Sequence, residues 1–164
     1  MKIQCIEKYQ FSQIEQSKQI IVHENARRFA IIDLGEKLGC YGFSWRSDLL
    51  EPTIVVSSDK KIWVGVDQRL VALNLHTGHI VVSLPLMTNI LQIQAAKKVT
   101  VVLTESELLL FNLDGSIRFA KGLPELASEM SICDWDVKIT DIEGNIWVVD
   151  IQTGAFKQSP VTGI

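Results

Sequence analysis

Cysteine is scarce in this sequence, and the residues that occur are far apart. There are three, Cys5, Cys40 and Cys133, and no pair has the Cys-x-x-Cys spacing. An odd number at long spacings excludes a disulfide framework and argues against a zinc site. We therefore expect buried free thiols, as in proteins of a reducing compartment.

Long hydrophobic runs are also missing. No window approaches the roughly 18 apolar residues of a membrane helix, and the longest run, Ile80 to Met87, is interrupted by Ser83 and Pro85. Charged Lys2 and Glu7 precede any apolar stretch, so the N-terminus does not have the pattern of a secretory signal. These absences predict a soluble cytoplasmic protein that does not bind membranes.

Catalytic and cofactor motifs are absent as well. No serine lies in a Gly-x-Ser-x-Gly elbow, and Gly35, Gly39 and Gly42 lack the spacing of a dinucleotide loop or P-loop. His76 and His79 form His-x-x-His, but no further ligands accompany them. The sequence predicts a protein that is not an enzyme and that has no cofactor and no bound metal.

An excess of positive charge is lacking. The chain has 16 Lys and Arg against 19 Asp and Glu, a formal charge of −3 and a pI near 5.6, which argues against a nucleic-acid partner. Apolar residues make up 47% and charged residues 21%, so the chain can fold. Its 164 residues predict a single β-repeat domain over 1–164.

What the sequence does contain is a repeat. Each copy is an apolar run followed by Asn or Asp, one more apolar residue and a glycine turn. The three clear copies are Leu70–Gly78, Leu108–Gly115 and Ile146–Gly154. Their shared Asn74, Asn112 and Asp150 recur every 38 residues. Asn or Asp before a turn can bond its own backbone, and glycine supplies positive φ.

A second strand-like run precedes each copy across a polar turn. These runs are Lys61–Val66, Val99–Leu103 and Val137–Thr140. A fourth, weaker copy pairs Gln19–His23 with Phe29–Gly35. Strand, turn and strand predict a β-hairpin, and stacked hairpins can bury apolar faces that one hairpin leaves exposed.

The predicted fold is all-β. It is a propeller-like stack of about four antiparallel hairpin or blade repeats of about 38 residues, with a β-sandwich as the alternative. Short helices are expected in connecting loops, at Ser12–Lys18, Ser47–Glu51 and Leu123–Met130. The repeat also predicts equivalent buried positions for Leu75, Leu113 and Ile151, and Trp63 and Trp147 are expected in the core.

The run Leu70–Ile80 resembles the blade signature of quinoprotein-type (PQQ-like) β-propellers, an apolar run followed by "ALxxxTG". Gln152-Thr153-Gly154 repeats its turn, and the resemblance covers residues 53–156. It implies four-stranded, blade-like sheets but no quinone site, because the active-site carboxylates and metal ligands of such enzymes are not evident. A small closed propeller, a half-propeller completed by a second copy and an open stack remain alternatives.

Negative charge is concentrated late in the chain, where residues 105–150 hold ten acids and three bases. Glu105 and Glu107 occupy one hairpin turn and Asp141 and Glu143 the next, so we expect them on one rim. The predicted partner-binding residues are Glu105, Glu107, Asp134, Trp135, Asp136, Asp141 and Glu143. The alternative is that these acids are only solvated.

These observations favour a non-catalytic protein-binding module. The most specific hypothesis is an immunity or inhibitor protein that neutralises a basic partner such as a nuclease toxin. A partial β-propeller with a structural or self-assembly role, such as a homodimer, is the alternative, followed by a small-molecule-binding protein or an enzyme.

Overall fold

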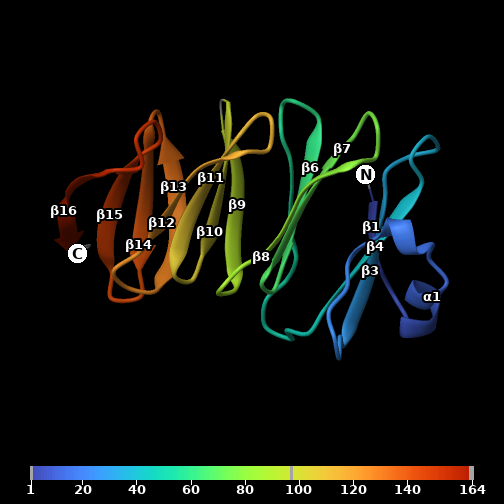
Figure 1. Cartoon of the computed structure of the whole chain (residues 1–164). Helices are drawn as coiled ribbons and strands as arrows, with labels where there is room; N and C mark the ends of the chain where they lie inside the picture. The colour runs from blue at the N-terminus through green and yellow to red at the C-terminus, as the bar shows by residue number, and fades with distance from the viewer. Residues whose placement is uncertain (1, 97, 163–164) are drawn as a thin grey trace.

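Four antiparallel β-sheets stand side by side like the blades of a propeller (Figure 1). The computed structural model describes residues 2–96 and 98–162, and the chain is 57% strand and 5% helix. The prediction of an all-β, propeller-like stack with four repeats is confirmed. Blades 1 and 4 lie at opposite ends of the row in Figure 1, so the stack is open.

Each blade has four strands. Blade 1 contains β1 (Lys2–Ile6), β2 (Gln19–Ile21), β3 (Arg28–Asp33) and β4 (Cys40–Trp45). Blade 2 contains β5 (Thr53–Val56), β6 (Lys61–Val66), β7 (Arg69–Asn74) and β8 (Ile80–Pro85). Blade 3 contains β9 (Ile90–Ala96), β10 (Val99–Thr104), β11 (Glu107–Asn112) and β12 (Ile117–Gly122). Blade 4 contains β13 (Ala127–Cys133), β14 (Asp136–Asp141), β15 (Asn145–Asp150) and β16 (Phe156–Thr162).

Blades 2, 3 and 4 are simple meanders in which consecutive strands pair antiparallel. The central hairpins β6–β7, β10–β11 and β14–β15 are the three that the repeat predicts. The first strands, β5, β9 and β13, contact one another from blade to blade along one side of the stack. Stacking in this way buries faces that a single hairpin would leave in water.

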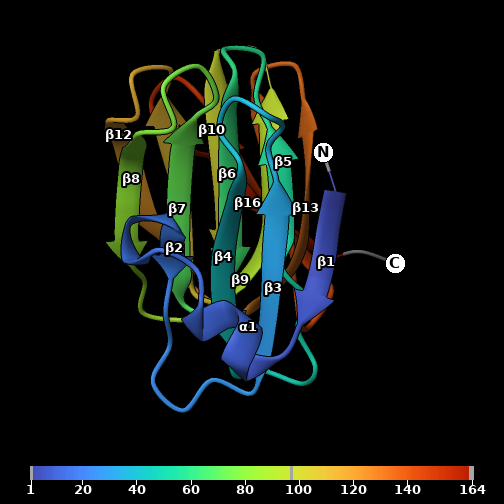
Figure 2. The same cartoon turned by 90° about the vertical axis from the view of Figure 1, so that its right-hand side faces the viewer.

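Blade 1 has a different strand order, β1-β3-β4-β2, and β2 runs parallel to β4. The predicted hairpin of Gln19–His23 with Phe29–Gly35 is therefore wrong, because β4 lies between the two strands. The helix α1 (Lys8–Ser12) lies against the face that points away from blade 2 (Figure 2). Phe11 of α1 packs 5.2 Å from the Phe29 ring and against Gly42, where a Cβ atom would clash.

The short helices differ from the predicted ones. A five-residue α1 and a 3₁₀ turn, η1 (Gln16–Lys18), replace the single helix expected over Ser12–Lys18. The helices expected over Ser47–Glu51 and Leu123–Met130 are absent from the described structure, where Ala127 already begins β13. Within 47–51 the Ser47 hydroxyl accepts backbone N–H groups, which favours a turn over a helix. Among the described residues, no helix has the length and apolar character needed to cross a bilayer.

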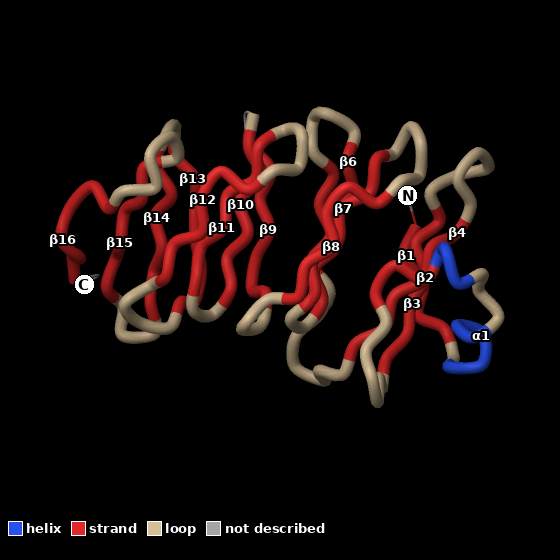
Figure 3. The backbone as a smooth tube through the Cα atoms, in the orientation of Figure 1, coloured by secondary structure: helices blue, strands red, loops and turns tan. Residues whose placement is uncertain are grey.

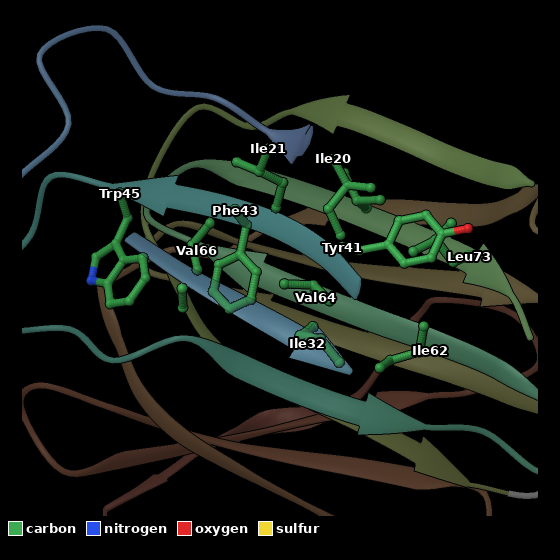
Figure 4. Packing of buried hydrophobic residues seen from close by; sticks show 12 residues of the cluster. Ile20, Ile21, Ile32, Tyr41, Phe43, Trp45, Ile62, Val64, Val66 and Leu73 are labelled. Carbon is green, nitrogen blue, oxygen red and sulfur yellow. The ribbon is translucent and has the colours of Figure 1, made fainter. Parts of the chain in front are cut away.

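The core consists of three apolar layers, one between each pair of neighbouring blades. Figure 4 shows the first layer, where Phe43 and Trp45 of β4 face Val64 and Val66 of β6. In the second layer the rings of Trp63 and Phe111 pack at a tilt, with their centroids 5.0 Å apart. Alternation along each central strand sends side chains to the layers on both faces, so the middle strands are almost continuously apolar.

Not every repeated position is buried as predicted. Leu75 and Ile151 are structurally equivalent, since their N–H groups donate to the carbonyls of Lys60 and Trp135, both at 2.9 Å. Ile151 is buried and Leu75 partly buried, but Leu113 is 40% exposed, so that prediction is wrong for Leu113. Residues at equivalent backbone positions can differ in burial, because burial depends on the side chains around them.

The cysteines also differ from expectation. Cys5, Cys40 and Cys133 are free, but all three are exposed rather than buried. Cys5 lies in β1, which ends its sheet, and the other two lie at strand termini, where less of the neighbouring blade covers them.

Connecting loops gather at two opposite edges of the stack, which are drawn tan in Figure 3. We call the edge at the bottom of Figure 3 the lower rim; its loops are 22–27, 46–52, 67–68, 86–89, 105–106, 123–126 and 142–144. The opposite edge is the upper rim; its loops include 34–39, 57–60, 75–79, 113–116, 134–135 and 151–155.

Candidate functional site

The loops of the lower rim interlock through backbone hydrogen bonds. The carbonyl of Asp67 accepts the N–H of Ile90, and the carbonyl of Glu105 accepts that of Ala127, both at 2.8 Å. The N–H of Ile142 donates to Leu126 at 2.9 Å. Two hairpin turns are thereby tied to the start of the next blade, and the turn of blade 4 is tied to the start of its own, so the side chains on the loops of blades 2 to 4 project from a fixed frame.

Large aliphatic side chains project from five loops of this rim. Their exposed fractions range from 46% to 93%. They are Val22, Leu49, Met87, Leu126 and Ile142. We call this set the apolar row. Single exposed apolar residues are ordinary, but one on each of five loops along one edge is typical of a protein-binding surface.

A groove of about 1090 Å³ lies on the lower rim between blades 1 and 2. Its walls are mainly polar and contain Arg27, Arg46 and Arg69, with Leu49 of the apolar row beside them. The groove is open to solvent, and its volume lies near the upper end of the range for ligand-binding clefts.

The other half of the rim, on blades 3 and 4, is acidic. Three residues of the predicted partner-binding set lie there with at least partly exposed side chains: Glu105, Glu107 and Glu143. Exposed Glu125 joins them from the 123–126 loop. The Glu105 carboxylate also accepts the N–H of Asn89 at 3.1 Å, so it has a structural role as well.

Asp141, the fourth acid predicted on this rim, is buried and unavailable to a partner. Its carboxylate accepts the indole N–H of Trp147 at 3.0 Å and the N–H groups of Glu143 and Asn145 at 2.9 Å. Burial alone would raise the pKa of Asp141, but these hydrogen bonds outweigh it and hold the pKa below its ordinary value. Asp141 therefore shapes the turn.

Glu105 and Glu143 are 38 residues apart, but they do not occupy equivalent positions in their blades. In blade 3 Leu103 pairs with Leu108, whereas in blade 4 Thr140 pairs with Ile146, so the second turn is one residue longer. Gly144, at φ +86°, accommodates the extra residue. As a result Ile142, and not Glu143, occupies the place of Glu105.

The predicted residues Asp134, Trp135 and Asp136 lie elsewhere, at the β13–β14 turn on the upper rim. The structure thus divides the predicted site between two edges. Asp136 pairs with Lys157 at 2.5 Å, and Trp135, 46% exposed, lines a pocket of about 360 Å³ between blades 3 and 4. Of the other tryptophans, Trp63 is buried as predicted, while Trp147 is only partly buried.

One cluster has the residue types of a hydrolase triad but not its connections. His23 Nδ1 lies 2.6 Å from the carbonyl of Ser44, and the Ser44 hydroxyl accepts the His23 backbone N–H at 3.0 Å. Nε2 of His23 is 3.9 Å from Asp67 Oδ2. The His23 ring therefore bonds the carbonyl of Ser44 and not its hydroxyl. Ser44 is also fully buried, so a substrate could not reach that hydroxyl. The cluster joins blades 1 and 2.

Residues 2–96 and 98–162 contain no group of three or more His, Cys, Asp and Glu placed to hold a metal ion. His76 and His79 lie at an upper-rim turn, where Asn74 accepts the His76 N–H at 2.8 Å. That turn is organised by backbone hydrogen bonds.

Sequence reasoning missed the apolar row and the groove arginines. One signal was available: Leu49 and Met87 are 38 residues apart, which is the repeat spacing, yet both lie between strands. An apolar residue that repeats in a loop, where burial does not require it, indicates a surface role.

No protein-family model matches the chain, and no curated protein matches it. Solved structures do. The computationally designed Ika8 protein aligns over 88% of this chain and 48% of its own, at 12% identity and a TM-score of 0.61. AztD from Citrobacter koseri aligns over 84% and 42%, at 14% identity and 0.58. Sqt1 from Saccharomyces cerevisiae aligns over 73% and 35%, at 14% identity and 0.57.

These similarities show the fold. The neighbours include WD40-type and other β-propellers, so the propeller-like resemblance is supported, although the quinoprotein type is not singled out. The chain spans less than half the length of Ika8, AztD and Sqt1.

Proposed function

We propose that this chain is a non-catalytic protein-binding module whose docking surface is the lower rim. The observation that carries the proposal is the exposed apolar row, Val22, Leu49, Met87, Leu126 and Ile142, of which the last three lie on loops held by backbone hydrogen bonds. Protein interfaces combine such an apolar centre with a charged margin. Rigid loops also lose little conformational entropy when a partner docks.

The acidic half of the rim indicates the chemistry of the partner. Glu107, Glu125 and Glu143 form no ion pair within the described residues, so their charge is free to meet lysine or arginine. A basic protein would be steered toward blades 3 and 4, and its binding would weaken with salt. An immunity or inhibitor protein acting on a basic toxin domain is the narrowest form of this proposal.

The test compares two matched quadruple variants against a partner captured from the native organism and then purified. One variant changes Leu49, Met87, Leu126 and Ile142 to Ser. The control changes four apolar residues away from the lower rim to Ser, Ile80, Val81, Leu113 and Ile117, which are 39% to 47% exposed.

Calorimetry should give at least a tenfold loss of affinity for the lower-rim variant, because hot spots of an interface are its buried apolar anchors. The control variant should bind as the parent chain does. Equal losses in both variants, or a loss in the control alone, would exclude the lower rim as the docking surface.

A further inference from the structure

We infer that the groove between blades 1 and 2 receives an acidic peptide segment that also carries aliphatic side chains. The inference rests on the proposed function. It concerns the part of the partner that would meet blades 1 and 2, at the opposite end of the lower rim from the acidic half. The unpaired Arg46 and Arg69, together with Val22 and Leu49 of the same lining, carry the inference.

Backbone contacts bring three arginines from separate segments to one place. The N–H of Arg27 donates to the carbonyl of Trp45 at 3.0 Å. The next residue, Arg46, donates its N–H to Asp67 Oδ2 at 2.7 Å, and Arg69 follows Asp67 by two positions. The side chains of all three arginines line the same groove and are exposed.

The groove lining holds three acids, Glu24, Asp48 and Asp67, beside its three arginines, so its formal charges balance. Asp67 is 9% exposed and is already engaged by the Arg46 backbone, and Asp48 pairs with Arg27 at 3.2 Å. The guanidinium groups of Arg46 and Arg69 form no ion pair or hydrogen bond with any described residue. Among the exposed charged side chains of the lining, those without an ion pair to a described residue are Arg46, Arg69 and Glu24, two cations and one anion.

Apolar wall residues decide what kind of anion fits. Exposed Val22 and Leu49 and the half-buried Leu86 line the groove beside the arginines. Arginine binds carboxylates through a bidentate fork, and the aliphatic walls favour Leu, Ile or Val side chains between the carboxylates. A nucleic acid is disfavoured, because the described lining has no Phe, Tyr or Trp on which bases could stack.

The rim is therefore bipolar. A partner that lies along it places an acidic, aliphatic segment over Arg46 and Arg69 and a basic surface over Glu125 and Glu143. Opposite charges at the two ends would fix the direction in which the partner docks.

The groove can be tested with the full chain and synthetic probes, without knowing the partner. A fluorescein-labelled peptide of five Glu and two Leu is titrated and followed by anisotropy. Matched peptides carry Gln or Lys in place of each Glu. The variant R46E/R69E is compared with K98E/K138E, which makes the same change in net charge at exposed sites outside the groove.

The Glu peptide should bind at least tenfold more tightly than the Gln and Lys peptides, with affinity falling as salt rises. R46E/R69E should lose this binding by tenfold or more, and K98E/K138E should keep it. Equal binding of the Gln peptide, or unchanged binding by R46E/R69E, would overturn the inference.

Two other occupants are tested in parallel. Tighter binding of a single-stranded oligonucleotide than of the Glu peptide would overturn the inference in favour of a nucleic acid. Concentration-dependent dimerisation that R46E/R69E abolishes would overturn it in favour of a second copy of the chain. Failure of the peptide assay leaves the calorimetric comparison of the two Ser variants untouched, so the two proposals can fail separately.

Discussion

The two rims of the stack are built from the same repeat, yet they use their residues differently. On the upper rim, Asn74 and Asp150 of the repeat, and Asp114 two residues after Asn112, each accept a backbone N–H two residues along the chain, at 2.7 to 2.9 Å. Lys61 donates to the carbonyl of Leu113 in the next blade, and Arg118 reaches Ile151 at 3.5 Å. Upper-rim polar groups are satisfied within the chain.

The lower rim differs in its apolar side chains. Asp67, Glu105 and Asp141 accept hydrogen bonds there as well, but five loops each carry a large apolar side chain that is 46% to 93% exposed. The residues that repeat most clearly, the Asn or Asp and the glycine of the upper turns, are therefore the ones that hold the fold. The lower loops vary in charge from blade to blade, and binding surfaces of repeat proteins lie where the repeat varies.

The largest expected effect lies beneath both rims, in the layer between blades 2 and 3. Trp63→Ala removes a side chain that is 1% exposed and packs against the ring of Phe111. We expect a loss of about 3–5 kcal/mol in the free energy of unfolding, the range for aromatic truncation in a core. Urea unfolding followed by circular dichroism measures it, and a loss below about 1 kcal/mol would contradict the layer as described.

The next prediction separates two positions that the repeat makes equivalent. Ile151→Ala should cost about 2–4 kcal/mol, because Ile151 is buried between blades 3 and 4. Leu113→Ala should cost less than about 1 kcal/mol, because its side chain is 40% exposed. Equal costs in the same unfolding assay would contradict the difference in burial between Ile151 and Leu113.

The upper rim should also be sensitive to acid. Hydrogen bonds from the N–H groups of Thr153 and Gln152, with Lys157 nearby, hold the pKa of Asp150 below its ordinary value of about 3.9. The stability that its carboxylate supplies is present above that value and is lost as the pH falls through the lowered pKa. Asp150→Asn should be less stable than the parent at pH 7, and the difference should shrink toward about pH 2.

Urea midpoints measured at a series of pH values test this prediction. A difference between the parent chain and Asp150→Asn that stays constant over the whole series would show that the carboxylate does not stabilise the turn.

The smallest effect on stability is expected on the lower rim itself. Leu49→Ser and Met87→Ser change side chains that are 93% and 81% exposed, so each should shift the free energy of unfolding by less than about 0.5 kcal/mol. Thermal unfolding of the two variants beside the parent chain checks this. A loss above about 1 kcal/mol would mean that these side chains pack within the fold, and the apolar row would lose its meaning as a docking surface.

The sequence predicts the central hairpins well because period-2 apolar runs and glycine turns are local signals, as in Lys61–Val66 and Leu108–Gly115. It does not predict blade 1, where β4 inserts between β2 and β3 through contacts distant in the chain. Nor does the sequence show that Asp141 is buried. The β14–β15 turn has one extra residue, but the spacing from Asn112 to Asp150 remains 38 and does not reveal it.

The candidate site was predictable in part. The acidity of Glu105, Glu107 and Glu143 follows from composition and turn placement, and the structure locates them on one rim. The placing of Asp134 and Asp136 with them is wrong, since successive turns of a meander alternate between the two edges of a sheet.

The central claim, that a partner docks on the lower rim, is tested most directly by hydrogen–deuterium exchange of the chain alone and with its purified partner. The account predicts slower exchange on binding in loops 46–52, 86–89, 123–126 and 142–144, with the upper-rim loops 75–79, 113–116 and 151–155 unchanged. Protection confined to the upper rim would contradict it.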